Sequence, residues 1–408
     1  MKIAVLTSSY PRYPGDGTAP FIQSLCTTLN KHGHDIEVIA PYDIDIRQNQ
    51  SSDVIVHRFK YVWPKRFHIM GHGRSLLSDV TLKPLTFVLL PLFIFAETLK
   101  LLDVTANQKS DLIHVHWVLP NGPAALVVSK IRKIPYVLSL HGSDIYVSTK
   151  NKVFSWFAKK VIKHASFISA CSPDLLIAAK RLGAGDKVAL LAWGADPVHF
   201  TPQRRDITFR QRHQWEVNKI VVFALGRMVF KKGFEILIRA WEKIQNDQDN
   251  ILLVIGGEGP IRTQLQNMIT KERIINVELP GRIPWTDVPD YLANADIFVM
   301  PSIKDQKGNL DGLPTVLLEA MSSGLPVIAS RIAGIPLVIQ DNRNGILVSP
   351  GNSNELAEAL LKLINNQDLR RRLGENARKD IITQFNWDSV ASKFEERYSN
   401  AVITSKHS

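Results

Sequence analysis

The 408-residue sequence has only two cysteines, Cys26 and Cys171, and it has no run of about 20 apolar residues. Two cysteines are too few for a disulfide framework or a structural zinc site, so we expect a reducing compartment. The lack of a long apolar run excludes a polytopic membrane protein. Low-complexity tracts and short repeats are also missing. With 45% hydrophobic and 22% charged residues, the composition is that of a globular protein, neither disordered nor fibrous.

Acidic residues are the scarcer charged type. The 38 Asp and Glu residues stand against 50 Lys and Arg, which gives a formal net charge of +12. This excess suggests an anionic partner: a nucleic acid, an anionic membrane face or a phosphorylated substrate. The opening residues Met1–Thr7 hold too few apolar residues for a secretory signal and are predicted to form a first buried strand.

Short apolar runs rich in Val and Ile alternate with segments of helical periodicity along the whole chain. Runs without polar alternation are typical of strands buried on both faces, so the pattern predicts α/β domains with parallel sheets. The clearest runs are Ile3–Leu6, Ile36–Ala40, Leu112–Val115, Tyr136–Leu140, Val188–Leu191, Ile220–Leu225, Ile251–Ile255, Ile297–Met300 and Val327–Ala329.

A polar stretch, Thr201–Lys219, separates two such strand–helix sets of similar size. We therefore predict two doubly wound domains, residues 1–200 and 201–384, with a ligand site between them at the carboxyl ends of the strands. The final segment, Phe385–Val402, has a helical apolar stripe of Trp387, Val390, Phe394 and Tyr398.

Two segments depart from this pattern. Pro84–Ala96 is strongly apolar but too short to span a bilayer, so we expect either a buried helix or a helix that dips into a membrane surface. Val147–Ser172 has five lysines and no acidic residue, with Val153, Phe154, Phe157 and Val161 on one helical stripe and Trp156 beside it. That helix could lie on an anionic membrane, or its stripe could pack on the domain.

The most informative stretch is residues 311–330, DGLPTVLLEAMSSGLPVIAS. Pro314 suits the first position of a helix and Gly324 its C-terminal cap. Amides at the start of this helix favour an anion such as a phosphate. Glu319 lies about 7–8 Å further along the axis, with its side chain tilted back. It could reach ribose hydroxyls beyond that phosphate, while Asp311 would lie on the other side of the anion.

A basic cluster, Gly226–Gly233, directly follows the strand Ile220–Leu225. Arg227, Lys231 and Lys232 would therefore lie where an α/β ligand binds, and could compensate the charge of a leaving diphosphate. Taken alone, such residues could equally be solvated.

Several other polar residues have weaker signals. His114, His116 and Trp117 end a predicted strand and could pack in the core or line an acceptor site, with no nearby acidic ligand set for a metal. Two Asp-x-Asp triplets, Asp43–Asp45 and Asp247–Asp249, resemble the metal-binding motif of metal-dependent glycosyltransferases, but both are interpreted as solvated acids outside the site.

The chain resembles glycosyltransferase family 4, which comprises retaining, nucleotide-sugar-dependent enzymes of the GT-B fold. The likeness spans nearly the whole chain, and the acidic-x7-Glu block is its most specific part. The segments that match are Asp311 with Glu319, Gly226-Arg227 with Lys232-Gly233, the glycine-rich turn Ile255–Pro260, Pro280–Pro284, His141–Asp144, Trp193–Asp196 and the opening strand with Gly15–Gly17.

The resemblance implies a GT-B fold, with two Rossmann-like doubly wound parallel-sheet domains facing a cleft. Residues 1–200 would bind the acceptor, completed by the helix in 385–408, and residues 201–384 would bind the nucleotide sugar. It also implies transfer with retention, without a metal or other cofactor.

The resemblance further assigns roles to residues. Arg227 and Lys232 would bind the donor diphosphate, Glu319 the ribose, and Asp311 and His141 the donor sugar. Other implied donor-binding residues are Gly257, Gly259, Arg282, Gly312, Leu313, Pro314, Thr315 and Val316. Gly15, Gly17 and Asp144 would form a loop for phosphate or acceptor. The family usually has Glu where this chain has Asp311, which puts the donor preference in doubt.

The expected partners are a UDP-, GDP- or ADP-sugar donor and a glycan or lipid-linked acceptor, in polysaccharide or glycolipid biosynthesis. No nucleic acid is expected, because basic and aromatic residues are not interleaved. The expected location is the cytoplasm, with peripheral contact to an anionic inner membrane face as an option. The alternatives are a sugar phosphorylase or nucleotide-sugar epimerase on a similar scaffold, a basic nucleic-acid-binding protein, and an inactive nucleotide-sugar sensor.

Overall fold

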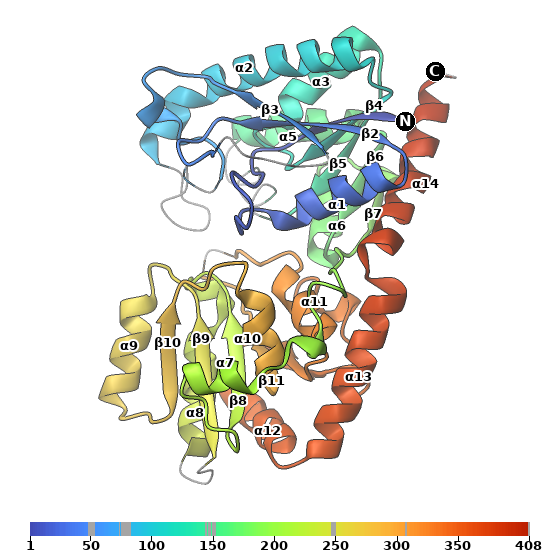
Figure 1. Cartoon of the computed structure of the whole chain (residues 1–408). Coiled ribbons are helices and arrows are strands. Elements are labelled where there is room, and N and C mark those ends of the chain that lie inside the picture. Colours follow the sequence, from blue (N-terminus) through green and yellow to red (C-terminus); the bar gives the residue numbers. More distant parts are fainter. Residues whose placement is uncertain are drawn as a thin grey trace. The chain divides into compact units, whose positions relative to one another are not determined.

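The computed structural model describes residues 1–47, 54–72, 74, 83–142, 145, 148, 152–245, 250–306 and 308–406. The chain forms two compact units (Figure 1). Unit 1 comprises Met1–Ala192 and Trp387–Ser408, and unit 2 comprises Trp193–Asn386. The second unit therefore starts at residue 193, where the sequence suggested 201, and ends at 386, where it suggested 384.

Unit 1 contains a seven-stranded parallel sheet in the order β3-β2-β1-β4-β5-β6-β7. Its strands are β1 (Lys2–Leu6), β2 (Asp35–Pro41), β3 (Ile55–Phe59), β4 (Leu112–His116), β5 (Tyr136–Leu140), β6 (Phe167–Ala170) and β7 (Val188–Leu190). Its helices are α1 (Pro20–Lys31), α2 (Pro84–Gln108), α3 (Gly122–Arg132), α5 (Lys152–His164), α6 (Pro173–Arg181) and α14 (Trp387–Lys406).

Unit 2 contains a six-stranded parallel sheet in the order β10-β9-β8-β11-β12-β13. Its strands are β8 (Ile220–Leu225), β9 (Ile251–Gly256), β10 (Val277–Gly281), β11 (Ile297–Met300), β12 (Val327–Ser330) and β13 (Ile346–Val348). Its helices are α7 (Ile207–Arg212), α8 (Phe234–Ile244), α9 (Arg262–Lys271), α10 (Val288–Asn294), α11 (Thr315–Ser322), α12 (Ser353–Ile364) and α13 (Gln367–Gln384).

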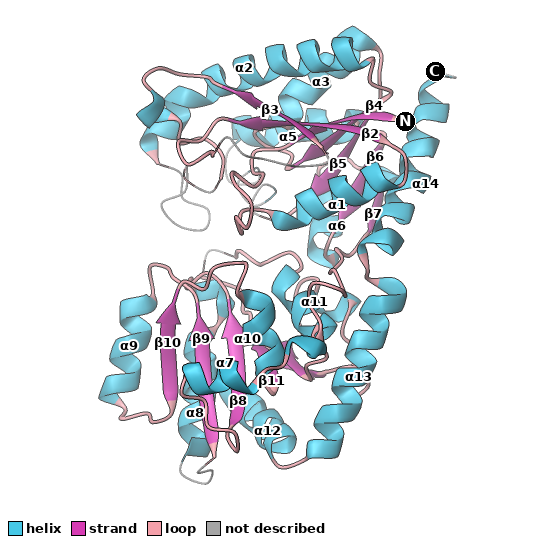
Figure 2. Cartoon of the chain, viewed as in Figure 1, coloured by secondary structure: helices cyan, strands magenta, loops and turns pink. Residues whose placement is uncertain are grey.

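Both sheets have the Rossmann arrangement, in which the first strand of the unit lies in the middle and the order reverses beside it (Figure 2). The prediction of two doubly wound α/β domains is confirmed. In such sheets ligands bind at the carboxyl ends of the strands, next to the point of reversal. In unit 2 this point lies between β8 and β11.

The apolar runs form the cores of both sheets because each strand is covered by helices on both faces. All nine predicted runs are strands within two residues of the predicted limits. In unit 2, helix α8 shows how a helix packs on one face of the sheet. Phe234, Leu237, Ile238, Trp241 and Ile244 recur at helical spacing and are all buried in the core cluster.

Helix α14 belongs to unit 1, although it ends the described chain. The predicted stripe of Trp387, Val390, Phe394 and Tyr398 is buried. The hydroxyl of Tyr398 lies 2.8 Å from Nδ1 of His114 in β4, and the rings of His114 and Phe394 are 5.3 Å apart. The last helix therefore supplies part of the core beneath the first sheet.

Helix α2 corrects two expectations about Pro84–Ala96. The helix continues to Gln108, so by length and composition alone it is long and apolar enough to cross a membrane. It is also buried on one face only. Leu89, Phe93 and Leu101 pack in the core, and α2 contacts β1, β2, β3 and α3. The side chains that face outward are apolar as well: Leu85, Phe87, Val88, Leu92, Phe95 and Leu99.

Helix α5 buries only Val161 of the predicted stripe. Ala158, Val161 and Ile162 are its buried residues, whereas Val153, Trp156 and Phe157 are exposed. The ring of Phe154 stacks on Phe87 of α2 at 6.2 Å, so the two helices meet at their aromatic side chains. Both α2 and α5 thus leave apolar groups exposed on unit 1.

Candidate active site

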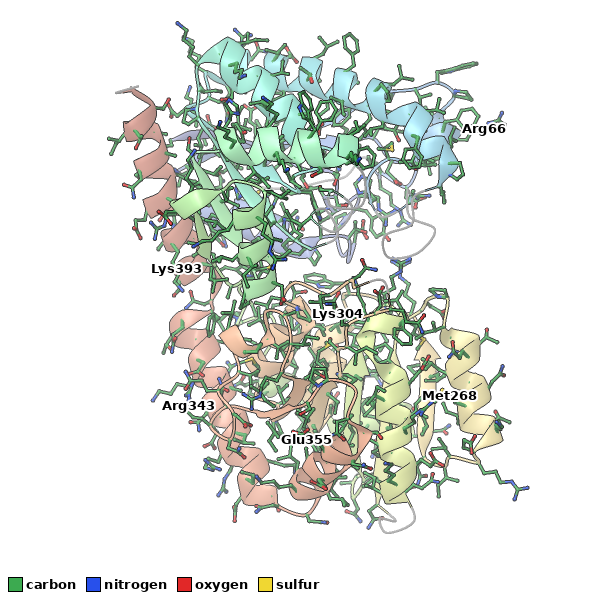
Figure 3. All side chains as sticks on the ribbon, turned by 180° about the vertical axis from the view of Figure 1, so that it is seen from behind. Arg66, Met268, Lys304, Arg343, Glu355 and Lys393 are labelled. Atoms are coloured by element: carbon green, nitrogen blue, oxygen red, sulfur yellow. The ribbon has the colours of Figure 1, made fainter. Side chains whose placement is uncertain are left out.

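The predicted donor-binding segments of unit 2 are joined by backbone hydrogen bonds at the carboxyl ends of its strands. The Gly226 amide donates to the Gly256 carbonyl (3.1 Å), Met228 to Glu258 (2.8 Å), and Gly257 to Gly281 (2.7 Å). The loops after β8, β9 and β10 therefore form one connected edge. Lys304, on the loop after β11, lies at the same edge (Figure 3).

Gly257 and Gly259 are needed for this packing of loop on loop. They have φ of 136° and 158°. A Cβ at Gly257 would lie 1.9 Å from the Gly226 carbonyl oxygen, and one at Gly259 would lie 2.3 Å from that of Met228. Any side chain at these positions would push the loop that carries Arg227 and Lys232 away from β9.

Asp311 lies between two lysines of the loop after β8. Its Oδ1 is 3.0 Å from Lys231 Nζ, and its Oδ2 is 2.6 Å from Lys232 Nζ. Burial alone would raise the pKa of Asp311, but the charges of Lys232 and Lys231 outweigh it and hold that pKa well below its usual range. The site therefore contains a carboxylate beside the amino groups of Lys231 and Lys232, both of which the sequence placed at this edge of the sheet.

The lysine loop is held in place from both sides. Phe230–Lys232 form a short 3₁₀ helix, and the Lys231 carbonyl accepts a hydrogen bond from the Ile303 amide after β11 (2.9 Å). Gly233 follows with φ of 69°, and a Cβ there would collide with the Pro301 carbonyl. The side chain of Arg227, three residues before the 3₁₀ helix, is exposed.

Helix α11 starts one residue later than predicted, at Thr315, because Pro314 precedes the helix with an extended ψ of 120°. Gly312 and Leu313 lead into it and are buried, with the Gly312 carbonyl accepting from the Gly334 amide (2.9 Å). Thr315 and Val316 form the first turn, which no side chain caps within the described part of the chain. Gly324, with φ of 75°, ends the motif as predicted.

Glu319 is the most unusual acid in this segment. Only 8% of its surface is exposed, and burial raises its pKa to about 8. Among the described residues, none donates a hydrogen bond to its carboxyl group. The two carboxyl oxygens are not among the fully buried polar atoms without a partner, so they keep some contact with solvent and a hydroxyl ligand can reach them.

Arg282 lies on the loop directly after β10, and its side chain is exposed. The preceding Gly281 has φ of 82° and accepts the hydrogen bond from Gly257. Arg282 is therefore placed at the same edge as the glycine-rich turn, on the outermost strand of the sheet.

In unit 1, His141 follows β5 and lies within an aromatic cluster. Its ring is 4.3 Å from that of Trp117 and 5.3 Å from that of Phe21, and its Nε2 is 3.1 Å from His116 Nδ1. Burial lowers the pKa of His141 to about 3, with a smaller contribution from His114. His141 is thus a neutral imidazole at ordinary pH. Asp144, predicted beside it, lies outside the described residues.

Gly15 and Gly17 flank a buried ion pair that the sequence did not suggest. Gly15 has φ of 80°. Asp16 between them is fully buried, and its Oδ2 is 2.7 Å from Arg12 Nε. The sequence predicted that Gly15 and Gly17 let the backbone approach a ligand without a Cβ. In the structure, the ion pair between Arg12 and Asp16 holds the loop that carries both glycines.

The interpretation of Asp43–Asp45 as solvated acids is wrong for Asp43. Only 1% of Asp43 is exposed, and its Oδ2 is 2.7 Å from Arg74 Nε, with Arg12 Nη1 3.6 Å from Oδ1. Asp45 pairs with the same two arginines. The partners are about 30 residues away in sequence, so no local pattern indicates them. The other triplet, Asp247–Asp249, lies outside the described residues.

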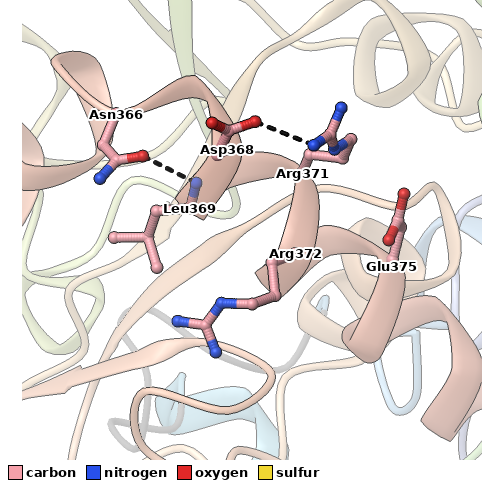
Figure 4. A pocket seen from close by; sticks show the side chains of 6 residues that line it. All are labelled: Asn366, Asp368, Leu369, Arg371, Arg372 and Glu375. Atoms are coloured by element: carbon pink, nitrogen blue, oxygen red, sulfur yellow. Dashed lines mark hydrogen bonds and ion pairs between the residues drawn. The ribbon is translucent and has the colours of Figure 1, made fainter.

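A surface hollow of about 410 Å³ lies at the start of α13, away from these loops (Figure 4). Its lining is formed by the residues of the first turns: Asn366, Asp368, Leu369, Arg371, Arg372 and Glu375. Asn366 caps the helix by accepting from the Leu369 amide (2.9 Å), and Asp368 pairs with Arg371 (2.9 Å). These local contacts explain the polar side chains without a ligand.

Comparison with known proteins identifies the class of protein to which this chain belongs. The family "Glycosyl transferases group 1" matches residues 206–380, and the family "Glycosyl transferase 4-like domain" matches residues 16–194. Together they match most of both units. The chain therefore belongs to the family 4 group of GT-B glycosyltransferases, and it is a glycosyltransferase.

Relatives of the same length support this assignment. The teichuronic acid biosynthesis glycosyltransferase TuaC of Bacillus subtilis is 29% identical, with 99% of this chain and 100% of that protein covered. N-acetyl-alpha-D-glucosaminyl L-malate synthase of Bacillus anthracis is 24% identical over nearly the full length of both chains. Other relatives are named for the biosynthesis of amylovoran, in Erwinia amylovora, and for the transfer of mannose to a phosphatidylinositol monomannoside, in Mycobacterium tuberculosis.

Solved structures share the fold. Sucrose-phosphate synthase from Thermosynechococcus elongatus has a TM-score of 0.76 at 19% identity, covering 99% of each chain. Anabaena Alr3699/HepE in complex with UDP has a TM-score of 0.75 at 20% identity, covering 98% of this chain and 100% of that one. At these identities the likeness establishes the GT-B fold.

Proposed function

We propose that this glycosyltransferase moves a sugar from a nucleotide-sugar donor to a glycan or lipid-linked acceptor, with retention of the anomeric configuration. The observation that carries the proposal is the site in unit 2, where Lys231, Lys232 and Asp311 meet at the carboxyl ends of the strands. A diphosphate that leaves the sugar develops negative charge, and cations fixed at that position stabilise it.

The roles of individual residues follow from their chemistry. Arg227 and Lys232 bind the donor diphosphate, with the amides of Thr315 and Val316 at the start of α11 beside it. The carboxyl group of Glu319, which is largely buried, forms hydrogen bonds with the ribose hydroxyls. Asp311, together with the backbone of Gly312, Leu313 and Pro314, contacts hydroxyls of the donor sugar.

The remaining predicted residues complete the site. Arg282 flanks the base on the outer side of the glycine-rich turn. His141 contacts the donor sugar from unit 1, and Gly15 and Gly17 bring backbone close to phosphate or acceptor. A phosphate oxygen of the donor takes the proton of the acceptor hydroxyl, so no separate carboxylate base is required.

A UDP-sugar is the first donor to test, since the Anabaena neighbour was solved with UDP and with UDP-glucose. GDP- and ADP-sugars are the other candidates. Thermal-shift measurements with each nucleotide would identify the base, because a ligand that binds the folded state raises Tm by mass action. Hydrolysis or transfer assays with the best donor then test the reaction. A chain that binds no nucleotide diphosphate would contradict the proposal.

The proposed chemistry needs no metal ion, because the lysines and Arg227 supply the positive charge. Transfer should therefore persist after dialysis against a chelator. Loss of transfer with EDTA, restored by Mg²⁺ or Mn²⁺, would contradict this part of the proposal.

We also propose that unit 1 contacts an anionic membrane from the cytoplasmic side. The surface in question, here called the apolar face, comprises the exposed apolar residues of α2 and α5. Phe87, Val88 and Phe95 of α2 are 53%, 68% and 64% exposed, and Trp156 of α5 is 56% exposed. Soluble proteins rarely expose large apolar side chains in such a group without a partner.

Charge favours a membrane as that partner. Helix α5 carries Lys152, Lys159, Lys160 and Lys163 and no acidic residue, and Lys160 lies over the ring of Trp156 at 5.7 Å. Lysines that surround exposed aromatic rings suit the headgroup region of an anionic bilayer. Helix α2 would lie on the bilayer and not cross it, because Leu89, Phe93 and Leu101 are part of the core of unit 1.

Sedimentation with vesicles tests this contact. We expect the protein to pellet with phosphatidylcholine vesicles that contain phosphatidylglycerol, and to be released by high salt, which screens the lysines. Phe95→Ser combined with Trp156→Ser should weaken binding, whereas Ile275→Ser, an equally exposed position of unit 2, should not. Binding that is absent, or that ignores both lipid charge and the double variant, would refute the contact.

A further inference from the structure

We propose that Arg378 of α13 is a positioning residue that holds the C-terminal end of helix α11 and, through it, the carboxyl group of Glu319. This role depends on the proposed binding of the donor ribose by Glu319. No motif of the sequence singled out Arg378, and all the contacts that assign it this role lie within unit 2.

Helix α11 is short and supplies no positive charge at its own C-terminal end. It has eight residues, and none in its last turn is basic. The carbonyl groups of a last turn have no partner within their helix and form the negative end of its dipole, so a cation placed there stabilises the helix. Helix α13, which packs against α11, provides this cation (Figure 1).

Arg378 binds four oxygen atoms around the end of α11. Its Nη1 donates to the carbonyl of Ser322, the last residue of α11, and to the carbonyl of Phe200 (3.2 Å). Its Nη2 donates to the Pro197 carbonyl (3.3 Å) and to the Thr201 hydroxyl (3.4 Å). No carboxylate of the described residues pairs with Arg378. The guanidinium group therefore joins α11, α13 and residues 197–201 at one point.

Further contacts fix the end of α11 against the same two segments. Ser322 Oγ donates to the Phe200 carbonyl (2.8 Å), and both residues are buried. Gly374 of α13 lies so close to the turn after α11 that a Cβ there would be 2.1 Å from the Gly324 carbonyl oxygen. The end of α11 is thus held between α13 on one side and residues 197–201 on the other.

Glu319 lies close enough to this end to move with it. It precedes Ser322 by three residues, which is about 4.5 Å along a helix axis. The Glu319 carbonyl accepts hydrogen bonds from the Ser323 amide (3.0 Å) and the Ser323 hydroxyl (3.1 Å), so Glu319 belongs to the last hydrogen-bonded turn. Fraying of that turn would displace the Glu319 carboxyl group, and hydrogen bonds to ribose hydroxyls tolerate little displacement.

Arg370 provides a matched control on the same helix. Its Nη1 donates to the carbonyls of Leu363 (2.6 Å) and Ile364 (2.7 Å), the last two residues of α12. Burial lowers the pKa of both Arg370 and Arg378. The two arginines thus act in the same way at the ends of two different helices, but α12 contains none of the proposed donor-binding residues.

Calorimetric titration with UDP and with 2′,3′-dideoxy-UDP tests the positioning role, because the second compound lacks the hydroxyls that Glu319 would bind. In the wild type we expect UDP to bind at least about tenfold more tightly than the dideoxy compound, as for two hydrogen bonds of ordinary strength. Arg378→Ala should lower this ratio to about threefold or less, mainly by weakening UDP binding. Arg370→Ala should lower Tm to a similar extent and keep the wild-type ratio. If thermal shift selects GDP or ADP, that nucleotide and its dideoxy form are used.

A wild-type ratio in Arg378→Ala, or an equal fall in Arg370→Ala, would overturn the positioning role. Should Arg378→Ala not fold, Arg378→Lys takes its place. Lysine keeps the positive charge but lacks the planar fork that reaches several oxygens at once, so the ratio should still fall at least about twofold. An unchanged ratio in Arg378→Lys would then refute the role.

Glu319→Ala separates this role from the proposed function. The variant should bind both nucleotides with nearly equal affinity. If it keeps the wild-type ratio, or if the wild type does not discriminate between the two nucleotides, Glu319 does not bind the ribose and the proposed function fails at that residue. If the ratio falls in Glu319→Ala and not in Arg378→Ala, the ribose contact stands and only the positioning role is refuted.

Discussion

Lys232 Nζ and Asp311 Oδ2 lie 2.6 Å apart in unit 2, although 79 residues separate them in the chain. Lys231 binds the other carboxylate oxygen at 3.0 Å. In the absence of a ligand, the carboxylate thus compensates the two lysines. A diphosphate that arrives must share these cations with Asp311 or displace it.

Asp311→Asn should separate binding of the nucleotide from transfer of the sugar. Removing the carboxylate leaves the two lysines uncompensated, so we expect UDP to bind several-fold more tightly. Transfer should fall, because the contact of Asp311 with the donor sugar is weakened. Calorimetric titration with UDP and a transfer assay would measure the two effects. Asp341→Asn, which removes an ion pair with Arg331 elsewhere in unit 2, is the control. Weaker UDP binding in Asp311→Asn would contradict the model of competition.

Lys232→Ala should lower kcat by about two to three orders of magnitude, the usual effect of removing one group that stabilises developing charge. The fold should survive, because Lys231 still pairs with Asp311. Circular dichroism and Tm would check the fold, and initial rates would check the activity. Lys271→Ala, at an exposed position of α9, should behave as the wild type. Unaltered turnover in Lys232→Ala would show that the diphosphate binds elsewhere.

Glu319 should make the stability of the ligand-free protein fall with rising pH. Burial raises its pKa to about 8, whereas an unfolded glutamate titrates near its ordinary value of about 4.3. Between these two pKa values the folded state holds the Glu319 proton more tightly than the unfolded state does. The free energy of unfolding therefore decreases as the pH rises, until about pH 8. Glu319→Gln, which stays neutral, should therefore raise Tm at pH 9 and change it little at pH 4.5. Exposed Glu358→Gln should show no such dependence. An equal effect at both pH values would contradict the buried carboxyl as its cause.

The contacts of His32 with α14 should stabilise the folded protein to an extent that depends on pH. Hydrogen bonds to Asp388 (3.0 Å) and Glu395 (2.9 Å) raise the pKa of His32. A raised pKa in the folded state gives stability that is present below the ordinary value of about 6.5 and is lost as the pH rises through the folded value. The Tm difference between wild type and His32→Gln should be largest at pH 5.5 and vanish at pH 9. Exposed His164→Gln serves as control, and a difference that grows with pH would be the opposite of the expected result.

The sequence predicted nine of the described strands and missed four, β3, β6, β10 and β13. β3 contains His57 and Arg58 at an edge of its sheet, and β10 contains Glu278 and Pro280 at an edge of the other. Edge strands keep one side near solvent, so they do not need a continuous apolar run. β6 and β13 have only four and three residues, but β7, β11 and β12 are equally short and were predicted, so length alone does not explain the difference.

Helix α2 shows that a residue with a charged side chain does not mark the end of a helix in the sequence. The predicted segment stopped at Ala96 because Glu97 follows. In the structure Glu97 is fully buried, and burial raises its pKa well above the ordinary value. It is therefore held in its neutral form, and the helix continues for eleven more residues to Gln108. Whether a carboxyl group is neutral depends on its surroundings in the fold, which local periodicity does not contain.

The candidate site could be predicted as a set of segments but not as a set of contacts. The order of strands and loops places Arg227, Gly257 and Arg282 at one edge of the sheet once a parallel sheet is assumed. The pairing of Asp311 with Lys231, and of Asp43 with Arg74, joins residues that are far apart in sequence. Such pairs depend on side-chain directions that only the packed structure determines.

The membership of α14 in unit 1 has a consequence for synthesis of the protein. His114 in β4 is translated 284 residues before its partner Tyr398. At ordinary ribosomal speeds this interval is on the order of tens of seconds, during which all of unit 2 emerges. Unit 1 is therefore started first and completed last, and a nascent chain stalled before residue 387 would expose to chaperones the side chains of α1 and β5 that α14 contacts.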